Sequence, residues 1–430
     1  MKKAALHNLG CKVNAYEARI MGGLLEEAGY EVVDFREWAD VYVVNTCSVT
    51  NIADRKSRQM LHRAKKQNPA AVVVAVGCYA QAAAGELEQD PAVDLVVGNE
   101  NKKDLATILE RYFSQRGEAA KQEAAKGLEG PGKGGDAGHT RAFIKVQDGC
   151  NQFCSYCIIP YLRGRVRSRS PEDVEGEVRA LAASGYREVV LTGIHLSSYG
   201  TDFSGGSGGL LGLLRRLHPI EGLSRIRLGS LEPRIITRDF VAALAEMEKI
   251  CPHFHLSLQS GCDETLKRMN RHYTTEEYEG RCGLLREFFT SPAITTDVIV
   301  GFPGETQEEF EETRAFLERI RFYEMHVFKY SKRDGTRAAQ MPGQLPEAIK
   351  ARRSEELLTL EKAMSGAYRR SFLGQGMQVL LEETVTVDGK TYIMGHSREY
   401  VKAAVPYGGQ APNTIVPLVP RRMLTESILC

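Results

Sequence analysis

Residues 143–157 read Phe143-Ile-Lys-Val-Gln-Asp-Gly-Cys150-Asn-Gln-Phe-Cys154-Ser-Tyr-Cys157. The first five residues are a short β-rich run, and a Cys-x₃-Cys-x₂-Cys triplet follows it closely. Three thiolates this close together indicate an iron–sulfur cluster, because a four-iron cubane is held by cysteine sulfur. Three ligands leave one iron open to chelate a small molecule, as the open position of a catalytic zinc site does. Structural zinc is the alternative, but it requires a fourth ligand, and no further cysteine or histidine stands at the usual spacing.

The sequence around this triplet alternates between strand-like and helix-like segments from Arg141 to about Ala339. Helical patterns such as Pro171–Ala183 and Thr306–Ile320 separate the strand-like runs. Six such units suit an open, partial (βα)₈-type barrel, in which right-handed crossovers place the functional loops at the strand C-termini. The six strand-like runs are Phe143–Gln147, Glu188–Leu191, Arg225–Leu228, His253–Leu258, Ile294–Gly301 and Met325–Tyr330.

Residues 1–113 show the same alternation and predict an α/β domain with a parallel sheet covered by helices. Helix-like stretches such as Ala15–Ala28 and Ala53–Lys66 lie between the strand-like runs. These runs are Ala4–Leu9, Glu31–Phe35, Val41–Asn45, Ala71–Val76 and Leu95–Val97.

Three cysteines of this N-terminal domain each stand just past the end of a predicted strand: Cys11, Cys47 and Cys78. The C-terminal ends of parallel strands line up along one edge of an open sheet, where ligands bind. We therefore expect the three thiols to converge, although no compact motif joins them. Buried cysteines are common and inert, so core packing is the alternative for any one of them.

The remaining sequence divides into a linker and a C-terminal module. Residues 114–140 lose the apolar pattern and are expected to be a flexible linker. The barrel domain then covers 141–369, and residues 370–430 change to short β runs separated by turns. We expect these runs to form a small β-barrel that is not woven into the βα pattern. A chain ending near Arg369 is therefore expected to keep its clusters.

The composition fits a soluble, cytoplasmic protein, with 43% hydrophobic and 26% charged residues in a chain of 430. No run approaches the roughly 18 apolar residues that a membrane span needs, and the N-terminus is too quickly polar for a signal peptide. Disulfides are rare in a reducing cytosol, so the ten cysteines are expected to be metal ligands, catalytic thiols or core residues. The net charge is only +1, so any RNA contact depends on local basic patches.

The cysteine triplet resembles the hallmark of radical S-adenosylmethionine (SAM) enzymes. The resemblance implies that the open iron binds SAM, and that an electron from the cluster cleaves it to methionine and a 5′-deoxyadenosyl radical. It implies that Tyr156 packs on the adenine, with ordinary core packing as the alternative. Val298-Ile-Val-Gly301-Phe-Pro-Gly304-Glu305 resembles the family's cofactor-contacting element, with a plain strand-to-helix turn as the alternative. Ser257 and Gln259 are further cofactor candidates, because they stand at a strand C-terminus, where barrel ligands bind.

Over nearly its full length the chain resembles the methylthiotransferase branch, which combines an N-terminal three-cysteine domain, a radical core and an RNA-binding TRAM module. This resemblance implies a second four-iron cluster at Cys11, Cys47 and Cys78, whose open iron holds the sulfur to be transferred. One SAM methylates that sulfur, and a second supplies the radical that removes an unactivated hydrogen from the acceptor. The cofactors carry this chemistry, so no side chain beyond the cluster ligands is assigned as catalytic. The expected electron donor is a flavodoxin- or ferredoxin-like protein.

Members of this family modify either an adenosine beside the tRNA anticodon or an aspartate of a ribosomal protein. Four stretches resemble the branch that acts on carbon 2 of N6-threonylcarbamoyladenosine at position 37 of tRNA. They are Gly10–Asn14, Asn45–Asn51, Ala53–Arg58 and Leu191–His195. The isopentenyl-adenosine branch usually carries Gln-Asn-Val-Asn-Ser where Gly193–Ser198 stand here. The alternatives are those other acceptors and a non-catalytic iron–sulfur protein that binds RNA.

Local basic residues are compatible with a tRNA anticodon stem-loop as the partner. Arg163 and Arg165 begin a run of alternating arginines that an extended strand would present on one face. Three basic residues of the C-terminal module could follow a phosphate path: Lys390, Arg398 and Lys402. A solvated charged surface is the alternative for each group.

Overall fold

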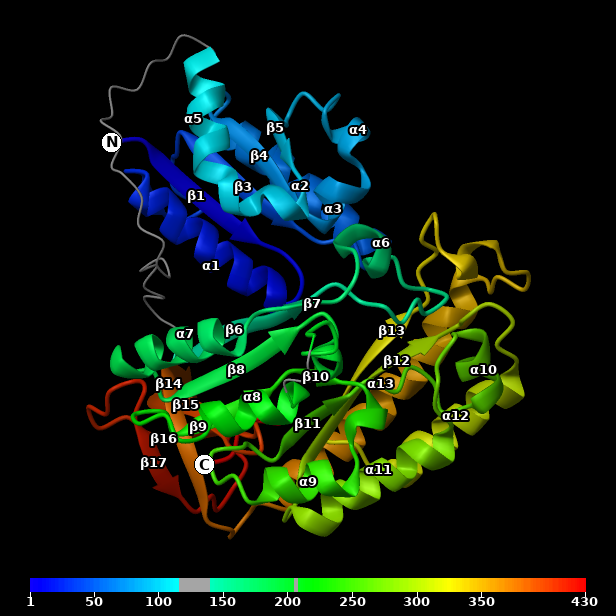
Figure 1. The fold of residues 1–430 in the computed structure, drawn as a ribbon. Helices are drawn as coiled ribbons and strands as arrows, with labels where there is room; N and C mark the ends of the chain where they lie inside the picture. Colours follow the sequence, from blue (N-terminus) through cyan, green and yellow to red (C-terminus); the bar gives the residue numbers. More distant parts are fainter. Residues whose placement is uncertain (116–139, 205–207) are drawn as a thin grey trace. The chain divides into compact units, whose positions relative to one another are not determined.

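The computed structural model describes residues 1–115, 140–204 and 208–430. The chain forms two compact units (Figure 1). The first contains Met1–Gly138 and Cys157–Arg165, and the second contains His139–Tyr156 and Val166–Cys430. The linker predicted at 114–140 lies almost entirely outside the described residues. Within the described ranges no helix is both long and apolar enough to cross a membrane.

The first unit is built on a five-stranded parallel sheet in the order β2-β1-β3-β4-β5. The five strands match the five predicted runs to within one or two residues at each end: β1 (Lys3–Asn8), β2 (Glu31–Val33), β3 (Val41–Thr46), β4 (Val72–Gly77) and β5 (Leu95–Val97). Its helices are α1 (Lys12–Glu27), α2 (Asn51–Gln67), α3 (Cys78–Ala82), α4 (Ala84–Leu87), α5 (Leu105–Gln115) and α6 (Ile159–Arg163), with a 3₁₀ turn at Asn99–Asp104.

Helices cover both faces of this sheet, which explains the continuous apolar runs of its central strands. Every residue of β3 and β4 is buried. Residues of α1 and α5, such as Met21 and Leu109, pack with one face, and residues of α2 and α3, such as Leu61 and Tyr79, pack with the other. A parallel sheet buried on both faces needs such runs, because neither face meets water.

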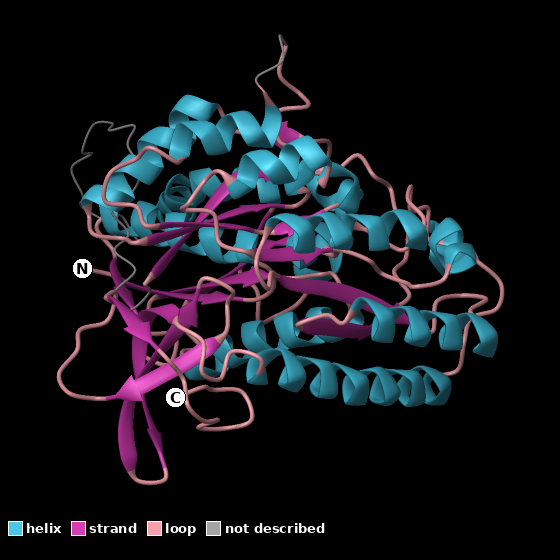
Figure 2. Cartoon of the chain, turned by 90° about the horizontal axis from the view of Figure 1, so that it is seen from below, coloured by secondary structure: helices cyan, strands magenta, loops and turns pink. Residues whose placement is uncertain are grey.

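The second unit contains a curled half-barrel of parallel strands with helices along its outer side (Figure 2). It confirms the six predicted strands: β6 (Arg141–Asp148), β8 (Glu188–Gly193), β9 (Arg225–Leu228), β11 (His253–Leu256), β12 (Ala293–Val300) and β13 (Glu324–Lys329). Two short strands are added, β7 (Arg167–Ser168) and β10 (Ser230–Leu231). The helices are α7 (Pro171–Ala183), α8 (Gly209–Leu217), α9 (Arg238–Ala245), α10 (Asp263–Arg268), α11 (Thr275–Phe288), α12 (Gln307–Ile320) and α13 (Glu347–Arg370).

Alternate residues of the half-barrel strands face opposite sides, as the period of a strand requires. Leu256, Val298 and Met325 belong to the large apolar core that the helices complete. Their neighbours His255, Asp297 and His326 therefore lie on the opposite side, which we call the inner face.

The C-terminal module is a four-stranded antiparallel sheet in the order β16-β15-β14-β17. The strands are β14 (Met377–Val387), β15 (Lys390–Ser397), β16 (Lys402–Pro406) and β17 (Ile415–Leu418). Asp388 and Gly389 join β14 to β15 with positive φ angles of 49° and 74°, as a two-residue hairpin turn requires. The resemblance to a TRAM barrel stays a prediction.

Buried arginines at the amino ends of the half-barrel strands dock this module through hydrogen bonds to its backbone carbonyls. Arg225 donates to the carbonyls of Gln378 and His396 at 2.8 and 2.9 Å. Arg227 donates to the Arg398 carbonyl at 2.9 Å and pairs with Glu188 at 2.7 Å. The Glu188, Arg225 and Arg227 side chains are at most 2% exposed. The module therefore covers charges that its removal would expose. The expectation that a chain ending near Arg369 keeps its clusters stays a prediction.

Candidate functional site

The first unit brings together the three dispersed cysteines at the carboxyl ends of adjacent strands. Cys11 caps α1 after β1, Cys47 directly follows β3, and Cys78 opens α3 after β4. Thr46 and Gly77 are register partners in β3 and β4, so the next residues, Cys47 and Cys78, are neighbours at the sheet edge.

Two glycines make room for this convergence. Gly10 has φ +101°, and a Cβ there would lie 2.8 Å from the Cys47 sulfur. Gly77 has φ +98°, and a Cβ there would lie 2.6 Å from the Thr46 carbonyl oxygen. Only glycine fits such a backbone so close to its neighbours. Burial raises the pKa of Cys47 to about 11, and the neighbouring Cys11 and Cys78 thiols add to that shift.

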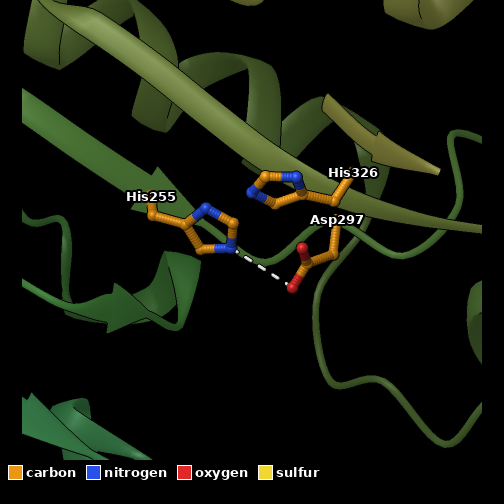
Figure 3. A group of neighbouring side chains, drawn as sticks. All are labelled: His255, Asp297 and His326. Atoms are coloured by element: carbon orange, nitrogen blue, oxygen red, sulfur yellow. Dashed lines mark hydrogen bonds and ion pairs between the residues drawn. The ribbon is translucent and has the colours of Figure 1, made fainter. Parts of the chain in front are cut away.

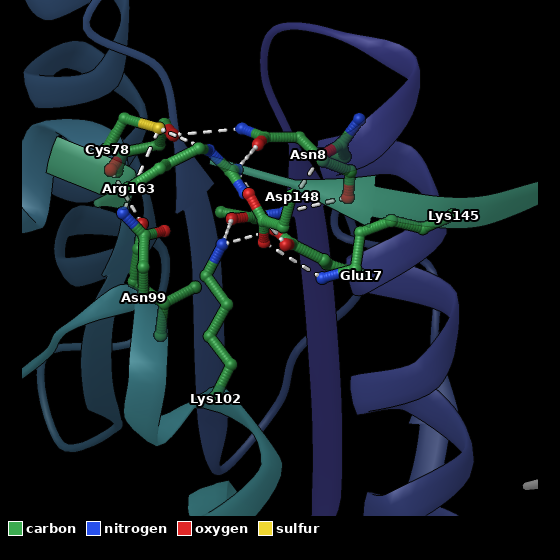
Figure 4. A network of polar contacts seen from close by, with 12 residues as sticks. Asn8, Glu17, Cys78, Asn99, Lys102, Lys145, Asp148 and Arg163 are labelled. Atoms are coloured by element: carbon green, nitrogen blue, oxygen red, sulfur yellow. Dashed lines mark hydrogen bonds and ion pairs between the residues drawn. The ribbon is translucent and has the colours of Figure 1, made fainter. Parts of the chain in front are cut away.

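A buried charge network adjoins these cysteines (Figure 4). Arg163 donates from Nε to the Cys78 sulfur at 3.3 Å, and its guanidinium pairs with Glu17 at 3.0 Å. Lys102 pairs with the same carboxylate at 2.6 Å. The Arg163 side chain is 1% exposed, and those of Lys102 and Glu17 are 7% and 8% exposed.

The charges of this network fit a bound anionic group. Two cations, Arg163 and Lys102, contact the same carboxylate close to Cys78, and a buried charge is costly unless it is paired. Burial lowers the pKa of Lys102, while the charge of Glu17 acts against that shift. A cubane held by three thiolates would bring negative charge to this place and support Glu17 in keeping the ammonium charged. The residues present therefore fit the second cluster.

Asparagine side chains fix the loops that carry the cysteines. The Asn14 amide donates to the carbonyls of Leu9 and Thr46 at 2.8 and 3.0 Å, and its oxygen accepts from Arg163 at 2.7 Å. Asn45 donates to the Asn14 carbonyl at 2.8 Å. These bonds tie the loops after β1 and β3 together and hold the guanidinium against Cys78.

The position of Arg163 argues against its predicted contact with RNA. It ends α6 instead of lying on an extended strand, because Gly164 turns the chain with φ +72° and β7 covers only Arg167–Ser168. Its charge is held by Glu17 and it is buried. Arg165 is exposed. Its RNA contact stays a prediction.

The Cys150–Cys157 triplet follows β6, as predicted, and protein groups donate to its sulfurs. The Gln152 backbone N–H lies 3.4 Å from the Cys150 sulfur. Arg271 donates to the Cys154 sulfur at 3.4 Å. All three thiols are half-buried and free of disulfides, and Cys157 opens the segment that belongs to the first unit. Donors of this kind favour thiolates, so these residues fit cluster ligands.

Arg271 is a further candidate site residue that the sequence did not reveal. Besides the Cys154 sulfur it donates to the Ser257 carbonyl at 3.0 Å and to the Tyr273 hydroxyl at 2.9 Å. It therefore connects a cluster ligand with a predicted cofactor residue. No spacing or periodicity marks an arginine that acts through contacts more than a hundred residues apart.

The structure also brings several predicted cofactor residues together. The Tyr156 ring meets Phe302 edge to face at 6.4 Å, and both pack with Ile299 and Tyr330. Phe302 lies in the turn between Gly301 and Gly304, which have φ +71° and +76°. Tyr156 thus adjoins the turn that resembles the adenine-contacting element, and its role there stays a prediction.

Two other cofactor candidates stand on the strand edge. Ser257 bonds to the Ser230 hydroxyl at 2.8 Å, and Gln259 has φ +75° and is buried. The Glu305 carboxylate accepts from Arg353 at 2.5 Å and from the Gly301 N–H at 2.7 Å. Its side chain is 2% exposed and holds the turn, and its cofactor contact stays a prediction.

The C-terminal basic residues have different surroundings. Lys390 and Lys402 are exposed. Arg398 donates to the carbonyl of Ile250 at 2.8 Å and to that of Glu248, so it fastens the module to the half-barrel. That placement argues against an RNA contact for Arg398, while those of Lys390 and Lys402 stay predictions.

Comparisons with known proteins agree with this geometry. The uncharacterized protein family UPF0004 matches residues 3–98, and the radical SAM superfamily matches residues 144–317. The threonylcarbamoyladenosine tRNA methylthiotransferase MtaB of Bacillus subtilis is 41% identical over 94% of this chain and 90% of its own. The MtaB protein of Aquifex aeolicus is 42% identical over 91% of this chain and 95% of its own. The chain belongs to the radical SAM methylthiotransferase family.

Relatives named for a different tRNA nucleoside are almost as similar in sequence. The tRNA-2-methylthio-N(6)-dimethylallyladenosine synthase of Carboxydothermus hydrogenoformans is 37% identical over 90% of each chain. Among solved structures, the radical SAM methyltransferase TsrM of Kitasatospora setae matches with a TM-score of 0.56 at 17% identity, over 79% of this chain and 77% of that one. That likeness shows the fold. Membership of the radical SAM superfamily implies a four-iron cluster and SAM as cofactors.

Proposed function

We propose that this chain transfers a methylthio group to carbon 2 of N6-threonylcarbamoyladenosine at position 37 of tRNA. The observation that carries the proposal is the meeting of Cys11, Cys47 and Cys78 beside a buried positive charge, in a chain that also has the Cys150–Cys157 triplet. The first set would hold the auxiliary cluster and the second the SAM-binding cluster. Two such sets suit a reaction that needs both a radical and a sulfur source.

The clusters and SAM would supply the radical and the sulfur when bound, and the protein's residues position them. Gly10 and Gly77 let the N-terminal cysteines approach each other. Arg163 and Arg271 each donate to one ligand sulfur, one in each set. Tyr156 and the Gly301 turn would form the adenine side of the SAM site, and Ser257 and Gln259 its strand edge.

The choice of acceptor rests on the relatives. Two of the most similar are named for threonylcarbamoyladenosine at 41% and 42% identity, and the dimethylallyladenosine relative is 37% identical. A tRNA anticodon stem-loop is therefore the proposed partner. A flavodoxin- or ferredoxin-like protein is the proposed electron donor, and the cytoplasm is the proposed location.

Nucleoside analysis of tRNA tests this proposal. Cells that lack the gene should accumulate N6-threonylcarbamoyladenosine and lose its 2-methylthio form, and a copy of the gene should restore it. Loss of the methylthio dimethylallyl nucleoside instead would assign the chain to the other tRNA branch. If neither nucleoside changes and a ribosomal protein loses a methylthio mass increment, the acceptor is that protein.

Arg163→Ala should lower the reduction potential of the auxiliary cluster. The change removes the N–H that Cys78 accepts and leaves the buried Glu17 with one cation fewer. Because hydrogen bonds to sulfur and positive charge raise a cluster's reduction potential, the midpoint potential of this cluster should fall. The measurement is a redox titration followed by electron paramagnetic resonance, in protein whose Cys150, Cys154 and Cys157 are alanine.

Arg58→Ala is the matched control for this experiment. Arg58 donates to the Tyr79 hydroxyl at 2.9 Å, and Tyr79 directly follows Cys78. It therefore stands near the same helix without a bond to sulfur. Equal potentials in the Arg163 and Arg58 variants would show that Arg163 has no influence on the cluster.

Exposed basic residues should contribute to tRNA binding through phosphates. Replacing Arg165, Lys390 and Lys402 with glutamine removes three charges, and the salt slope of log affinity should fall by roughly one for each phosphate that one of them neutralises. Filter binding across a salt series measures this slope. Glutamine at Lys362 and Lys267 is the control, because these lysines are charged but not predicted to meet RNA. An unchanged slope in the triple variant would place the RNA surface elsewhere.

A further inference from the structure

Two histidines and one aspartate gather on the inner face of the half-barrel, apart from the residues assigned above. His255 lies on β11, Asp297 on β12 and His326 on β13, which are adjacent parallel strands. Their ligand atoms all lie within 4.8 Å of one another (Figure 3). Three polar side chains from three strands thus share one place on a sheet whose other face is apolar.

Hydrogen bonds orient one imidazole of this group. His255 Nε2 lies 3.2 Å from Asp297 Oδ2, and Nδ1 lies 3.0 Å from the Thr295 hydroxyl. The His326 ring stacks beside the His255 ring, with centroids 5.9 Å apart and planes inclined by 28°. His326 is exposed, so its ring nitrogens are accessible to a ligand.

The group lies between the docked module and the proposed SAM site. On β11, His255 stands two residues before Ser257 on the same face, a separation of about 7 Å along the strand. Two residues before His255, the His253 ring meets Tyr400 of the C-terminal module at 4.9 Å. A ligand bound by this group would therefore lie on the inner face of the half-barrel, about two strand residues from the proposed SAM contact at Ser257.

The group suits a polar organic ligand better than a metal ion. With metal–ligand bonds of about 2.0–2.2 Å, the ligand atoms of an ion would lie roughly 3–3.5 Å apart. These atoms spread over as much as 4.8 Å, and both nitrogens of His255 already have hydrogen-bond partners. Asp297 accepts N–H and O–H groups, and an imidazole N–H donates to carbonyl or carboxylate oxygen.

We propose that Asp297 and His326, with Asp297 held in place by His255, recognise the polar N6 substituent of the acceptor adenosine and select a threonylcarbamoyl group over a hydrocarbon one. This inference rests on the proposed function and names the determinant of its acceptor. The threonylcarbamoyl group carries N–H and O–H donors together with carbonyl and carboxylate oxygens. A dimethylallyl group has none of them and would offer Asp297 and His326 no hydrogen-bond partner. Sites built to hydrogen-bond a polar substrate strongly reject an analogue that lacks those groups.

The test compares anticodon stem-loops of one sequence that carry threonylcarbamoyl-, dimethylallyl- or unmodified adenosine at position 37. The holoenzyme should bind the threonylcarbamoyl stem-loop about tenfold more tightly than the unmodified one. His326→Phe keeps an aromatic ring without nitrogen, and Asp297→Asn removes the charge. Each should abolish most of this preference. Loss of the preference alone, with iron content and melting temperature as in the wild type, identifies the two side chains as determinants of acceptor binding.

His62→Phe is the matched control. His62 also pairs with an aspartate, Asp90 at 2.8 Å, but on the first unit. It should keep the preference. If the His326 and Asp297 variants keep it as well, the inference is overturned.

Two further outcomes separate the inference from the function on which it rests. A wild type that methylthiolates only the dimethylallyl stem-loop overturns the proposed acceptor and the inference together. A wild type that methylthiolates the threonylcarbamoyl stem-loop, while its variants bind all three stem-loops as it does, overturns the inference alone. Metal analysis closes the alternative: a non-iron metal present in the wild type and absent from both variants means a metal site and overturns the inference.

Discussion

Replacing Cys11, Cys47 and Cys78 with alanine should abolish methylthio transfer while 5′-deoxyadenosine still forms. The central triplet belongs to a separate loop after β6, so its cluster should assemble without the N-terminal thiols. Alanine at Cys150, Cys154 and Cys157 should abolish both reactions. Product nucleoside and 5′-deoxyadenosine are measured together by chromatography and mass spectrometry.

Iron content provides an independent measurement of the same two clusters. Anaerobically reconstituted wild type should hold about eight irons, and each triple variant about four. Wild type with about four irons, unchanged in the N-terminal variant, would rule out the second cluster. Methylthiolated product from the N-terminal variant would place the sulfur source elsewhere. Cys251→Ala is the control, because this cysteine is buried near Arg227 and belongs to neither set.

Glu188→Gln should lower the free energy of unfolding by about 3–5 kcal/mol, the cost of leaving a buried charge without its partner. Burial alone would raise the pKa of Glu188, but the charge of Arg227 and its hydrogen bond outweigh burial and hold that pKa below its usual value. The carboxylate is therefore charged in the folded protein. Without it, Arg225 and Arg227 stay buried beside each other. Urea unfolding followed by circular dichroism measures the change.

Glu287→Gln serves as the matched control. Glu287 also pairs with an arginine, Arg238 at 2.7 Å, but both side chains are at least half exposed. Exposed pairs contribute little, so unfolding should barely change. Equal unfolding curves for the two variants would mean that the Glu188 network does not stabilise the docked module. A chain ending at Arg370 should melt well below the full chain for the same reason.

Much of the fold could be predicted because it depends on local pattern. The six half-barrel strands and the five N-terminal strands each carry an apolar run bounded by turn residues. Helices such as α7 began and ended where caps and periodicity placed them, with Ser170 capping its first turn. The cluster triplet needed only its own spacing. The location of Cys11, Cys47 and Cys78 at the carboxyl ends of their strands also followed from the sequence, because the ends of parallel strands line up along one edge of the sheet.

The alternating arginines show where local pattern misled. An i, i+2 spacing predicts one face of a strand, but Arg163 ends a helical turn and points into a buried carboxylate. Arg398 stands among exposed lysines in the sequence, yet it fastens the module to backbone carbonyls. The local sequence does not distinguish a charged side chain that is exposed to solvent from one that contacts a buried partner.

The sequence by itself determined the strands, the two cysteine sets and the order of the domains. Only the tertiary structure decided which side chains surround them. Arg163 meets Glu17 across 146 positions, Arg271 meets Cys154 across 117, and Arg225 meets His396 across 171. The group of His255, Asp297 and His326 likewise exists only because three strands lie in register. Periodicity records which face a residue takes, but a contact between distant residues depends on how whole elements pack, and no local spacing carries that information.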